Sequence, residues 1–366
     1  MSANHSHTDP HTGPLTDASS VAVIGAGIAG LACTNVLTQA GQRVALFDKA
    51  RGAGGRMSSK RRPDATVDLG AQAFTVRDDD FAAEVERWRG AGCIAEWPNA
   101  VYQASPSGWQ PYHDGQTRYT GAPRMSAITR HLAETLTAQG AILYSATRIT
   151  ALTKTADGWE LSCQNGDVFG PYTQVVITAP PPQAESLVQP WDNTLSSLCK
   201  HLPQQSCWAG WAVFETPLPT LPGVAPDWQM ARAQHPALRL ISRNATKPGR
   251  ETEPESVSLI AQLDWSAAHL EEQSDAVAQQ LFDALKSLFP ALLAFPRVSD
   301  IGAHRWRYSQ PAEDVDMPTE GFAIGRDGLA LCGDSLRGGR VEDAWLSGYT
   351  LAQALLEERG STVSPR

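Results

Sequence analysis

Short runs of consecutive apolar residues alternate along the chain with longer stretches in which apolar residues recur every three or four positions. The apolar runs 21–25 and 44–48 are typical of strands buried on both faces. The spacing across 28–39 predicts a helix that Gly41 closes. In this order the three segments predict a strand–helix–strand unit of about thirty residues with a right-handed crossover.

The same patterns predict the elements that follow. Asp78, Asp79 and Asp80 precede an amphipathic segment, 81–89, and are interpreted as the cap and first turn of a helix. Between the strands expected at 141–145 and 159–163, Asp157 and Gly158 predict a hairpin turn. The proline run 180–182 predicts a stiff crossing between domains. Further helices are expected at 125–139, 274–289 and 341–358, and further strands at 174–178, 207–214, 257–264 and 329–332.

The glycine-rich, buried-strand pattern of the N-terminus returns at 329–332, after a middle region of different character. We therefore expect the opening and closing segments to fold together, and the middle to supply a second domain. The predicted fold is mixed α/β (α+β), with a discontinuous Rossmann-type dinucleotide-binding domain formed by 20–80, 125–182 and 295–358. A mixed-sheet substrate domain is expected from 81–124 and 183–294, and a disordered tail at 1–19.

Composition narrows the classes of function. The chain has 366 residues, of which 42% are hydrophobic and 19% charged, so about two folded domains are expected. The net charge of −9 argues against nucleic acid or an anionic membrane as the main partner. The six scattered cysteines contain no C-x-x-C pair and predict buried thiols, with neither a disulfide framework nor a metal site. The polar first twenty residues lack a secretory pattern, which predicts a cytoplasmic location.

A G-x-G-x-x-G motif follows the first predicted strand and opens the first predicted helix. Its glycines permit a tight turn, let the backbone approach a pyrophosphate, and allow close packing of helix on strand. The helix N-terminus adds unpaired N–H groups and a positive dipole. Asp48 ends the second strand, where its carboxylate can accept hydrogen bonds from a ribose diol. These features together predict a dinucleotide site.

A second glycine-rich loop follows Asp48. In this loop Arg51 and Arg56 flank Gly54 and Gly55, an arrangement in which guanidinium groups and exposed backbone can both contact phosphate oxygens. The sequence from 48 to 58 resembles the second glycine-pair motif of FAD enzymes of the amine-oxidase superfamily. The segments 51–62, 68–74, 121–130 and 304–308 are most similar to bacterial renalase-like proteins, and the resemblance extends over nearly the whole chain after residue 20.

A C-terminal turn completes the expected cofactor site. Cys332, Gly333 and Asp334 end a buried strand, and 338–344 leads into the last helix, so backbone N–H groups converge where reduced flavin is rich in electrons. The resemblance implies that Arg56 binds near the FAD pyrophosphate and Asp334 near the ribityl chain or phosphates. It also implies backbone contacts from Val341 and Glu342 to the isoalloxazine. The expected set for non-covalent FAD is Gly25, Ala26, Gly27, Ile28, Ala29, Gly30, Asp48, Lys49, Arg51, Gly55, Arg56, Met57, Gly333, Asp334, Arg340, Val341 and Glu342.

The substrate side offers aromatic and basic residues. A flavin-face pocket is predicted from Gln72, Phe74, Trp208, His304 and Trp306. No G-x-S-x-G motif or Cys–His pairing is present, so hydrolysis has no support.

The renalase resemblance implies an oxidase that takes a hydride from an isomeric dihydronicotinamide dinucleotide, 2- or 6-dihydro-NAD(P). The products are NAD(P)+ and hydrogen peroxide from oxygen. Such a reaction forms an aromatic cation directly and requires no general base. Two alternatives stay open: a flavin amine oxidase acting on a small amine, and a flavin-binding sensor or scaffold without turnover. The expected partners are a small-molecule substrate and oxygen.

Overall fold

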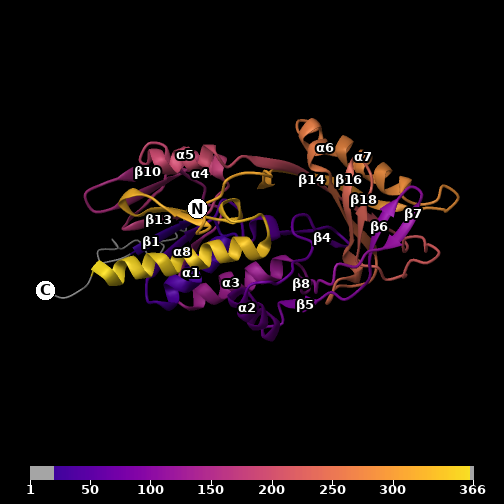
Figure 1. The fold of residues 1–366 in the computed structure, drawn as a ribbon, viewed down its shortest axis with the longest axis horizontal. Helices are drawn as coiled ribbons and strands as arrows, with labels where there is room; N and C mark the ends of the chain where they lie inside the picture. The colour runs from indigo at the N-terminus through magenta and orange to yellow at the C-terminus, as the bar shows by residue number, and fades with distance from the viewer. Residues whose placement is uncertain (1–19, 363–366) are drawn as a thin grey trace, which may run out of the picture.

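The computed structural model describes residues 20–362, which form two lobes arranged along the long axis of the molecule (Figure 1). The tail predicted to be disordered, 1–19, lies outside the described residues. One lobe is built on a six-stranded sheet and the other on a seven-stranded sheet. The predicted mixed α/β fold with two unlike sheets is confirmed.

The six-stranded sheet has the strand order β19-β20-β13-β1-β2-β9 and is parallel except at its edge strand β19. Along β1, Val21 and Val23 face one apolar core whereas Ala22 and Ile24 face another, which explains why the run is uniformly apolar. Five strands were predicted to within one residue at each end. The six strands are β1 (Ser20–Ile24), β2 (Arg43–Phe47), β9 (Ile142–Tyr144), β13 (Gln174–Ile177), β19 (Phe322–Ile324) and β20 (Leu329–Cys332).

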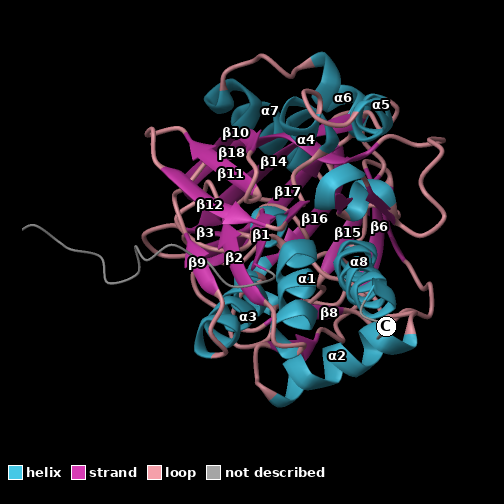
Figure 2. Ribbon diagram, turned by 90° about the vertical axis from the view of Figure 1, so that its left-hand side faces the viewer, coloured by secondary structure: helices cyan, strands magenta, loops and turns pink. Residues whose placement is uncertain are grey.

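Helices cover one face of this sheet, where α1 and α8 run side by side (Figure 2). A Cβ atom on Gly348 would lie 2.0 Å from the carbonyl oxygen of Ala29, so a glycine is needed where α8 crosses α1. These helices are α1 (Ile28–Gln39), α2 (Asp79–Gly90), α3 (Ser126–Ala138) and α8 (Val341–Thr362). The other face carries α4 (Pro181–Val188), α5 (Asn193–Lys200) and a small sheet of β10 (Ile149–Lys154), β11 (Trp159–Cys163) and β12 (Val168–Tyr172).

The second lobe contains the seven-stranded sheet, in the order β18-β14-β17-β16-β15-β6-β7, with α6 and α7 packed on one face. Its long strands β14 and β18 pair antiparallel and reach back toward the first lobe (Figure 1). The elements are β6 (Val101–Ser105), β7 (Gly108–Pro111), β14 (Gln204–Phe214), β15 (Met230–Ala233), β16 (Leu238–Arg243), β17 (Glu255–Ala261), β18 (Val298–Pro311), α6 (Leu263–Ala268) and α7 (Ser274–Ser287).

A small hairpin connects the two lobes. Val67 and Leu69, on and just after its second strand, pack against the face of β14 that carries Cys207, Ala209 and Trp211. This hairpin directly follows the second glycine-rich loop, so the loop and the seven-stranded sheet are held together through it. The remaining elements are β3 (Ser59–Arg61), β4 (Thr66–Asp68), β5 (Ile94–Glu96) and β8 (Tyr119–Gly121), with short 3-10 turns η1 (Gly55–Met57), η2 (Asn244–Thr246), η3 (Arg326–Gly328) and η4 (Asp334–Leu336).

Several elements pack differently from the domain division that the sequence predicted. β18 was assigned to the dinucleotide domain, but it pairs with β14 in the seven-stranded sheet. α2, α5 and most of α4 were assigned to the substrate domain, yet all three helices pack on the six-stranded sheet. Sequence position alone does not indicate which sheet an amphipathic helix or a long strand will cover, because either surface can bury its apolar side chains.

Three local predictions were wrong. The proline run does not form an extended crossing: Pro181 and Pro182 begin α4, where their missing N–H groups cost nothing. The hairpin at Asp157 and Gly158 joins β11 to β10, which the sequence did not predict, rather than to β9. The strand expected at 257–264 ends at Ala261, and α6 begins two residues later.

Three further findings concern the described chain as a whole. All six cysteines are buried and free, in agreement with their scattered spacing. Between residues 20 and 362, no helix combines the length and apolarity needed to cross a bilayer. Nor do any three His, Cys, Asp or Glu side chains in that range gather as a metal site.

Candidate functional site

The first glycine-rich turn joins β1 to α1 at the carboxyl edge of the six-stranded sheet. Gly25 adopts φ +114°, and its N–H donates to the carbonyl of Phe47 at 2.7 Å. A Cβ on Gly30 would lie 1.9 Å from the carbonyl oxygen of Gly25, so helix and strand pack too closely for any other residue. By contrast, a Cβ on Gly27 would meet nothing within 4 Å. The turn is therefore closed on the protein side and open on the side where Gly27 begins the helix.

Asp48 lies directly beside this turn. Its Oδ2 accepts the N–H of Ala26 at 2.7 Å, and its Oδ1 accepts the N–H of Ala50 at 2.7 Å. Each carboxylate oxygen keeps further acceptor capacity, since an ionised carboxylate offers about four lone-pair sites. The carboxylate is thus fixed in orientation and can still accept hydroxyl donors.

The second glycine-rich loop packs on the first. The N–H of Gly54 donates to the carbonyl of Ala26 at 2.9 Å, and a Cβ on Gly55 would lie 3.5 Å from the Cα of Gly27. Gly54 and Gly55 have φ of +153° and +52°, which favour glycine, and Met57 anchors the end of the loop in the core. The two loops therefore form one cradle of exposed backbone.

Arg56 extends from this cradle to the C-terminal turn. Its two terminal nitrogens bind the two oxygens of Asp334 at 2.6 Å each, and one of them also donates to the carbonyl of Ser309 at 3.0 Å. The Asp334 side chain is 7% exposed and that of Arg56 is 30% exposed. A bidentate, largely buried pair of this kind is among the stronger polar interactions in proteins. The predicted convergence of the two chain ends is present in the structure.

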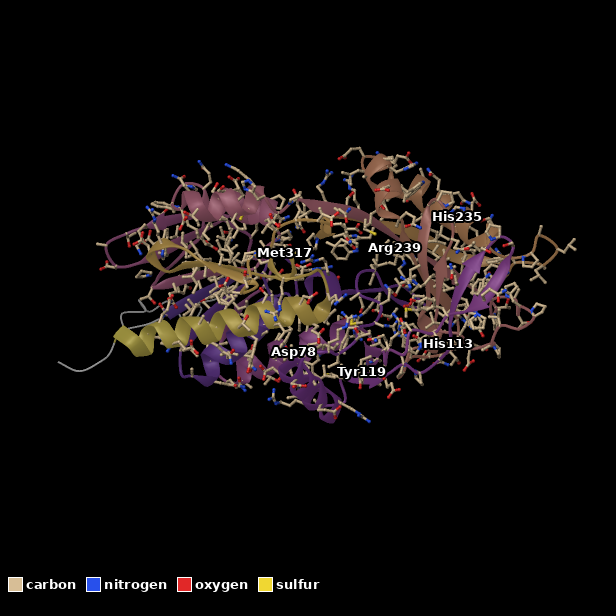
Figure 3. All side chains as sticks on the ribbon, in the orientation of Figure 1. Asp78, His113, Tyr119, His235, Arg239 and Met317 are labelled. Atoms are coloured by element: carbon tan, nitrogen blue, oxygen red, sulfur yellow. The ribbon has the colours of Figure 1, made fainter. Side chains whose placement is uncertain are left out.

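The C-terminal turn is supported by hydrogen bonds from α8. The N–H of Gly333, which has φ +145°, donates to the hydroxyl of Ser347 at 2.8 Å. The carboxylate of Glu342 accepts the N–H groups of Arg77 and Asp78 at 2.6 and 2.9 Å, and Asp78 lies just below the N-terminal end of α8 (Figure 3). The side chain of Glu342 thus holds the chain before α2. Val341 begins α8, and Arg340 directly precedes it, with its N–H donating to the carboxylate of Asp343 at 3.1 Å.

Comparison with known families identifies this arrangement. Residues 23–85 match the family described as an NAD(P)-binding Rossmann-like domain. Residues 96–356, well over half of the chain, match the family described as flavin-containing amine oxidoreductase. The chain belongs to the flavin-containing amine oxidoreductase family.

Solved structures with the fold of this amine oxidoreductase share little sequence with it. A protein assigned as a protoporphyrinogen oxidase from Exiguobacterium sp. 255-15 is 14% identical, with a TM-score of 0.71 over 93% of this chain and 99% of its own. A putrescine oxidase solved with putrescine is 12% identical, with a TM-score of 0.68 over 93% of this chain and 99% of its own. An oxidoreductase from Methanosarcina mazei is 11% identical, with a TM-score of 0.68 over 92% and 100%.

The cofactor of this family member is FAD, and the cradle fits it. The open backbone at Gly27, the oriented carboxylate of Asp48 and the N-terminus of α1 are the donor and acceptor set that an adenosine diphosphate requires. Arg56 and Asp334 would lie beside the phosphate and ribityl part. FAD, when bound, supplies hydride acceptance, which no side chain of the protein can provide.

A group of side chains that we call the aromatic–cationic cluster lies where the hairpin β3–β4 meets the seven-stranded sheet. Trp211 stands at its centre: the Lys60 ammonium lies 4.2 Å from the ring centroid, and the indole N–H donates to Asp300 at 2.7 Å. Arg62 binds both oxygens of Asp300, at 2.6 and 2.7 Å. The cluster consists of Lys60, Arg62, Trp211, Asp300, His304 and Trp306.

His304 and Trp306 bring the cluster toward the cradle. Their rings meet edge to face at 4.4 Å, and the indole N–H of Trp306 donates to the carbonyl of Leu69 at 2.8 Å. Three residues further along β18, Ser309 accepts from Arg56. Burial lowers the pKa of His304, and the positive charge of Lys60 lowers it further, so the imidazole is neutral at pH 7. The two rings are in contact, and their place on the flavin face of a pocket stays a prediction.

Three predicted pocket residues are engaged elsewhere. Trp208 points to the opposite face of β14, packs in the α7 core and donates to the carbonyl of His269 at 3.0 Å. Phe74 is buried in an aromatic core with Phe81 and Trp88. The amide of Gln72 donates to the carbonyls of Asp68 and Gly70, so this side chain shapes a turn rather than facing open space.

A buried charged group next to this turn was not predicted. The carboxylate of Asp68 accepts from Lys247 at 2.8 Å, from Arg250 and from the hydroxyl of Ser59 at 2.5 Å, and Lys247 also donates to Gln72 at 3.1 Å. Burial by itself would raise the pKa of Asp68, but the two cations and the hydrogen bonds lower it to about 2. Burial lowers the pKa of Lys247 to about 8 in spite of Asp68. This group ties β4 to the segment after β16.

Lys49 and Arg51 do not point into the cradle. The Lys49 ammonium donates to the side chain of Gln183 at 3.1 Å, and its pKa is lowered by burial and by the charge of Arg148. Arg51 is exposed and lines a separate cavity beside α3. A smaller cavity of about 450 Å³, lined by Gln310, Met317 and Gly338 among others, lies near the C-terminal turn.

The sequence contained little information that could have corrected these assignments. β14 is buried on both faces from Ser206 to Phe214, so no polar alternation distinguishes the face of Trp208 from that of Trp211. Lys60 lies on the short strand β3, and Arg62 directly follows its last residue, Arg61. This alternation was the one available indication of which basic residues share a face.

Proposed function

We propose that the protein is a renalase-like FAD-dependent oxidase whose substrate is an isomeric dihydronicotinamide dinucleotide, 2- or 6-dihydro-NAD(P). The products are NAD(P)+ and, through oxygen, hydrogen peroxide. The segments 51–62, 68–74 and 304–308 resemble renalase-like proteins. The first contributes to the cradle and to the aromatic–cationic cluster, the third contributes His304 and Trp306 to the cluster, and Leu69 of the second accepts a hydrogen bond from Trp306.

The charge of the aromatic–cationic cluster is the observation that carries the proposal. Its one carboxylate, Asp300, is already bound by Arg62 and by Trp211. Lys60 forms no ion pair within 4 Å among residues 20–362, so the cluster has an excess of positive charge. Burial lowers the pKa of Lys60 and repulsion from Arg62 lowers it further, while the charge of Asp300 opposes this shift without cancelling it. Such a site attracts the phosphates of a dinucleotide and repels a protonated amine.

The aromatic members suit the other half of such a substrate. Trp306 and neutral His304, which are partly exposed, can contact a flat, uncharged dihydronicotinamide ring through their faces and edges. Trp211 is buried and positions Lys60 and Asp300. Loss of hydride converts that ring to an aromatic cation, and no proton has to be removed from carbon. The chain's own residues would therefore orient the ring and exclude water, while the cluster needs no general base.

An amine oxidase is the second candidate, because the family and the fold neighbour solved with putrescine both point to amines. Its substrate must approach the flavin as a neutral amine or find a carboxylate for its ammonium group. The pairing of Asp300 with Arg62 counts against the second option at this position.

Anaerobic mixing of the yellow holoenzyme with separate substrates tests the proposal. We expect the flavin absorbance to bleach when 2- or 6-dihydro-NAD(P) is added. NADH, putrescine and other small amines should leave the flavin oxidised. Bleaching by amines alone would establish the second candidate. Bleaching by no compound would favour a flavin-binding sensor, and a purified protein that takes up no FAD would contradict all three.

The variant Lys60→Met links this activity to the cluster. We expect KM for the isomeric dinucleotide to rise about tenfold, because one charge contact to phosphate is lost. The matching dihydronicotinamide riboside, which lacks phosphates, should show an unchanged KM. An equal effect on both compounds would contradict phosphate recognition by Lys60.

A further inference from the structure

A second basic site lies on the outer side of the cradle. A cavity of about 760 Å³ runs along α3, between this helix, the second glycine-rich loop and β3. Four arginines line it, and they come from three separate segments: Arg51 from the loop, Arg61 from β3, and Arg124 and Arg130 from the start of α3. We call this cavity the arginine groove.

The arginine groove is separate from the flavin cradle. The N–H of Gly54 bonds to Ala26, and Gly55 rests on Gly27, so the loop itself lies between the two sites. On its outer side, the carbonyl of Ala53 accepts from Thr129 of α3 at 3.5 Å. Arg56 bonds to Asp334 and is not part of the groove lining. A ligand in the groove would therefore contact the back of the loop and not the face that receives FAD.

The positive charge of the four groove arginines is not balanced by carboxylates of the described residues. Among residues 20–362, Arg130 alone of the four forms an ion pair, with Glu134 at 2.7 Å. Burial lowers the pKa of Arg124, and repulsion from Arg61, Arg130 and Arg250 lowers it further. Such unbalanced positive charge stands out in a chain of net charge −9.

The helix that forms one wall adds to this positive field. α3 begins at Ser126 with no acidic residue in its first turn and no side-chain cap from Met125. The positive end of the helix dipole therefore lies next to Arg124. The first N–H groups of the helix are bonded within the protein, that of Met125 to Asp68 at 3.3 Å and that of Ser126 to the hydroxyl of Ser59 at 3.1 Å. The dipole adds to the positive field, and the guanidinium groups would make the contacts to an anion.

The opposite end of the groove is less polar. Toward the C-terminal end of α3 the lining consists of Ala133, Ala138 and, from β9, Leu143, together with the hydroxyl residues Thr137 and Ser145. α3 packs beside β9 (Figure 2). The volume is within the range of about 300–1,000 Å³ that small-molecule sites occupy. A ligand with phosphates at one end and a flat apolar group at the other would match both ends.

We propose that the arginine groove binds a phosphate-bearing molecule of nucleotide size, with its phosphates on Arg61, Arg124 and Arg130 and its base over Leu143. The site is independent of the flavin substrate proposed above. Its ligand class is that of a nucleoside diphosphate.

Calorimetric titration of FAD-saturated holoenzyme with ADP, pyrophosphate and adenosine, at constant ionic strength, tests this. We expect ADP to bind more tightly than pyrophosphate, and adenosine to show no measurable binding. The double variant R61Q/R124Q should raise the dissociation constant of ADP at least tenfold. Glu134→Gln, which releases Arg130 from its ion pair, should lower that constant. Arg89→Gln, an exposed arginine on α2, is the matched control and should change nothing.

Several outcomes would overturn the proposal. Unchanged ADP affinity in R61Q/R124Q would show that Arg61 and Arg124 do not bind ADP. Equal affinity for pyrophosphate and ADP would show that the groove does not recognise the nucleoside part. Release of FAD on addition of ADP would mean that ADP enters the flavin cradle instead. Without ligand, R124Q should unfold at the same or a higher temperature than the unmodified protein, since a repulsive charge is removed; a large decrease would indicate that Arg124 is structural.

Discussion

Arg56 and Asp334, which are 278 positions apart in the chain, form a bidentate ion pair with both N–O distances at 2.6 Å. This pair joins the second glycine-rich loop to the turn before α8. Both residues were predicted to hold the phosphate and ribityl part of FAD, and the structure brings them into direct contact. We therefore expect binding of the cofactor and closure of the fold to depend on the same two side chains.

The variant Arg56→Ala should lose both stability and cofactor. It leaves Asp334 buried without its partner, and we expect a loss of about 2 kcal/mol, below the value for a fully buried pair because Arg56 is partly exposed. The ratio of flavin to protein absorbance after gel filtration should fall together with the melting temperature. Arg89→Ala, at an exposed ion pair on α2, should leave both unchanged. Full flavin retention in Arg56→Ala would contradict the assigned contact.

Asp48→Asn should weaken FAD binding with little effect on the fold. The amide keeps the shape but loses the charge that accepts the N–H groups of Ala26 and Ala50 and that would accept ribose hydroxyls. Hydrogen bonds to a charged group contribute about 1.5–3 kcal/mol, so the dissociation constant should rise roughly ten- to hundredfold. Titration of apoprotein with FAD, followed by flavin fluorescence, measures this. Asp157→Asn in the β10–β11 turn is the control.

The stability of the protein should decrease in acid partly through Asp68. Its pKa is lowered from 3.8 to about 2 in the folded protein, so its contribution is present above pH 3.8 and is lost as the pH falls toward 2. The full contribution is about 2 kcal/mol, of which roughly half should be lost by pH 3. Urea unfolding at pH 7, 4 and 3 measures this loss as a decrease in the free energy of unfolding.

The variant Lys247→Met isolates this effect. It removes one cation from Asp68 and keeps Arg250, so the fall in unfolding free energy between pH 7 and 3 should become smaller than in the unmodified protein. Identical acid dependence in the two proteins would show that Lys247 does not lower the pKa of Asp68.

Trp208 and Trp211 lie on opposite faces of β14, and we expect only Trp211 to affect substrate binding. Trp211→Phe loses the hydrogen bond to Asp300 and weakens the stacking of Lys60, so KM for the substrate should rise about tenfold while FAD content stays constant. Trp208→Phe, on the opposite face, should lower the melting temperature without changing KM. Steady-state kinetics and thermal unfolding of both variants provide the comparison. A KM effect in Trp208→Phe alone would reverse the two assignments.

The sequence by itself determined the strand–turn–helix unit, the glycines of both loops and the position of Asp48. These features depend on backbone conformation and on spacing within one short segment, which consecutive residues encode directly. For the same reason the boundaries of β1, β2 and α1 were predicted almost to the residue.

Only the tertiary structure decided which charges meet and which side chains share a cavity. The ion-pair partners of Arg56, Asp68 and Arg62 are between 179 and 278 positions away, so their pairing depends on the tertiary packing within and between the lobes. A strand buried on both faces carries no polar alternation, so the opposite directions of Trp208 and Trp211 could not be predicted from the sequence. Arg51, assigned to the flavin phosphates by its spacing, lines the arginine groove because the loop turns its outer side toward α3.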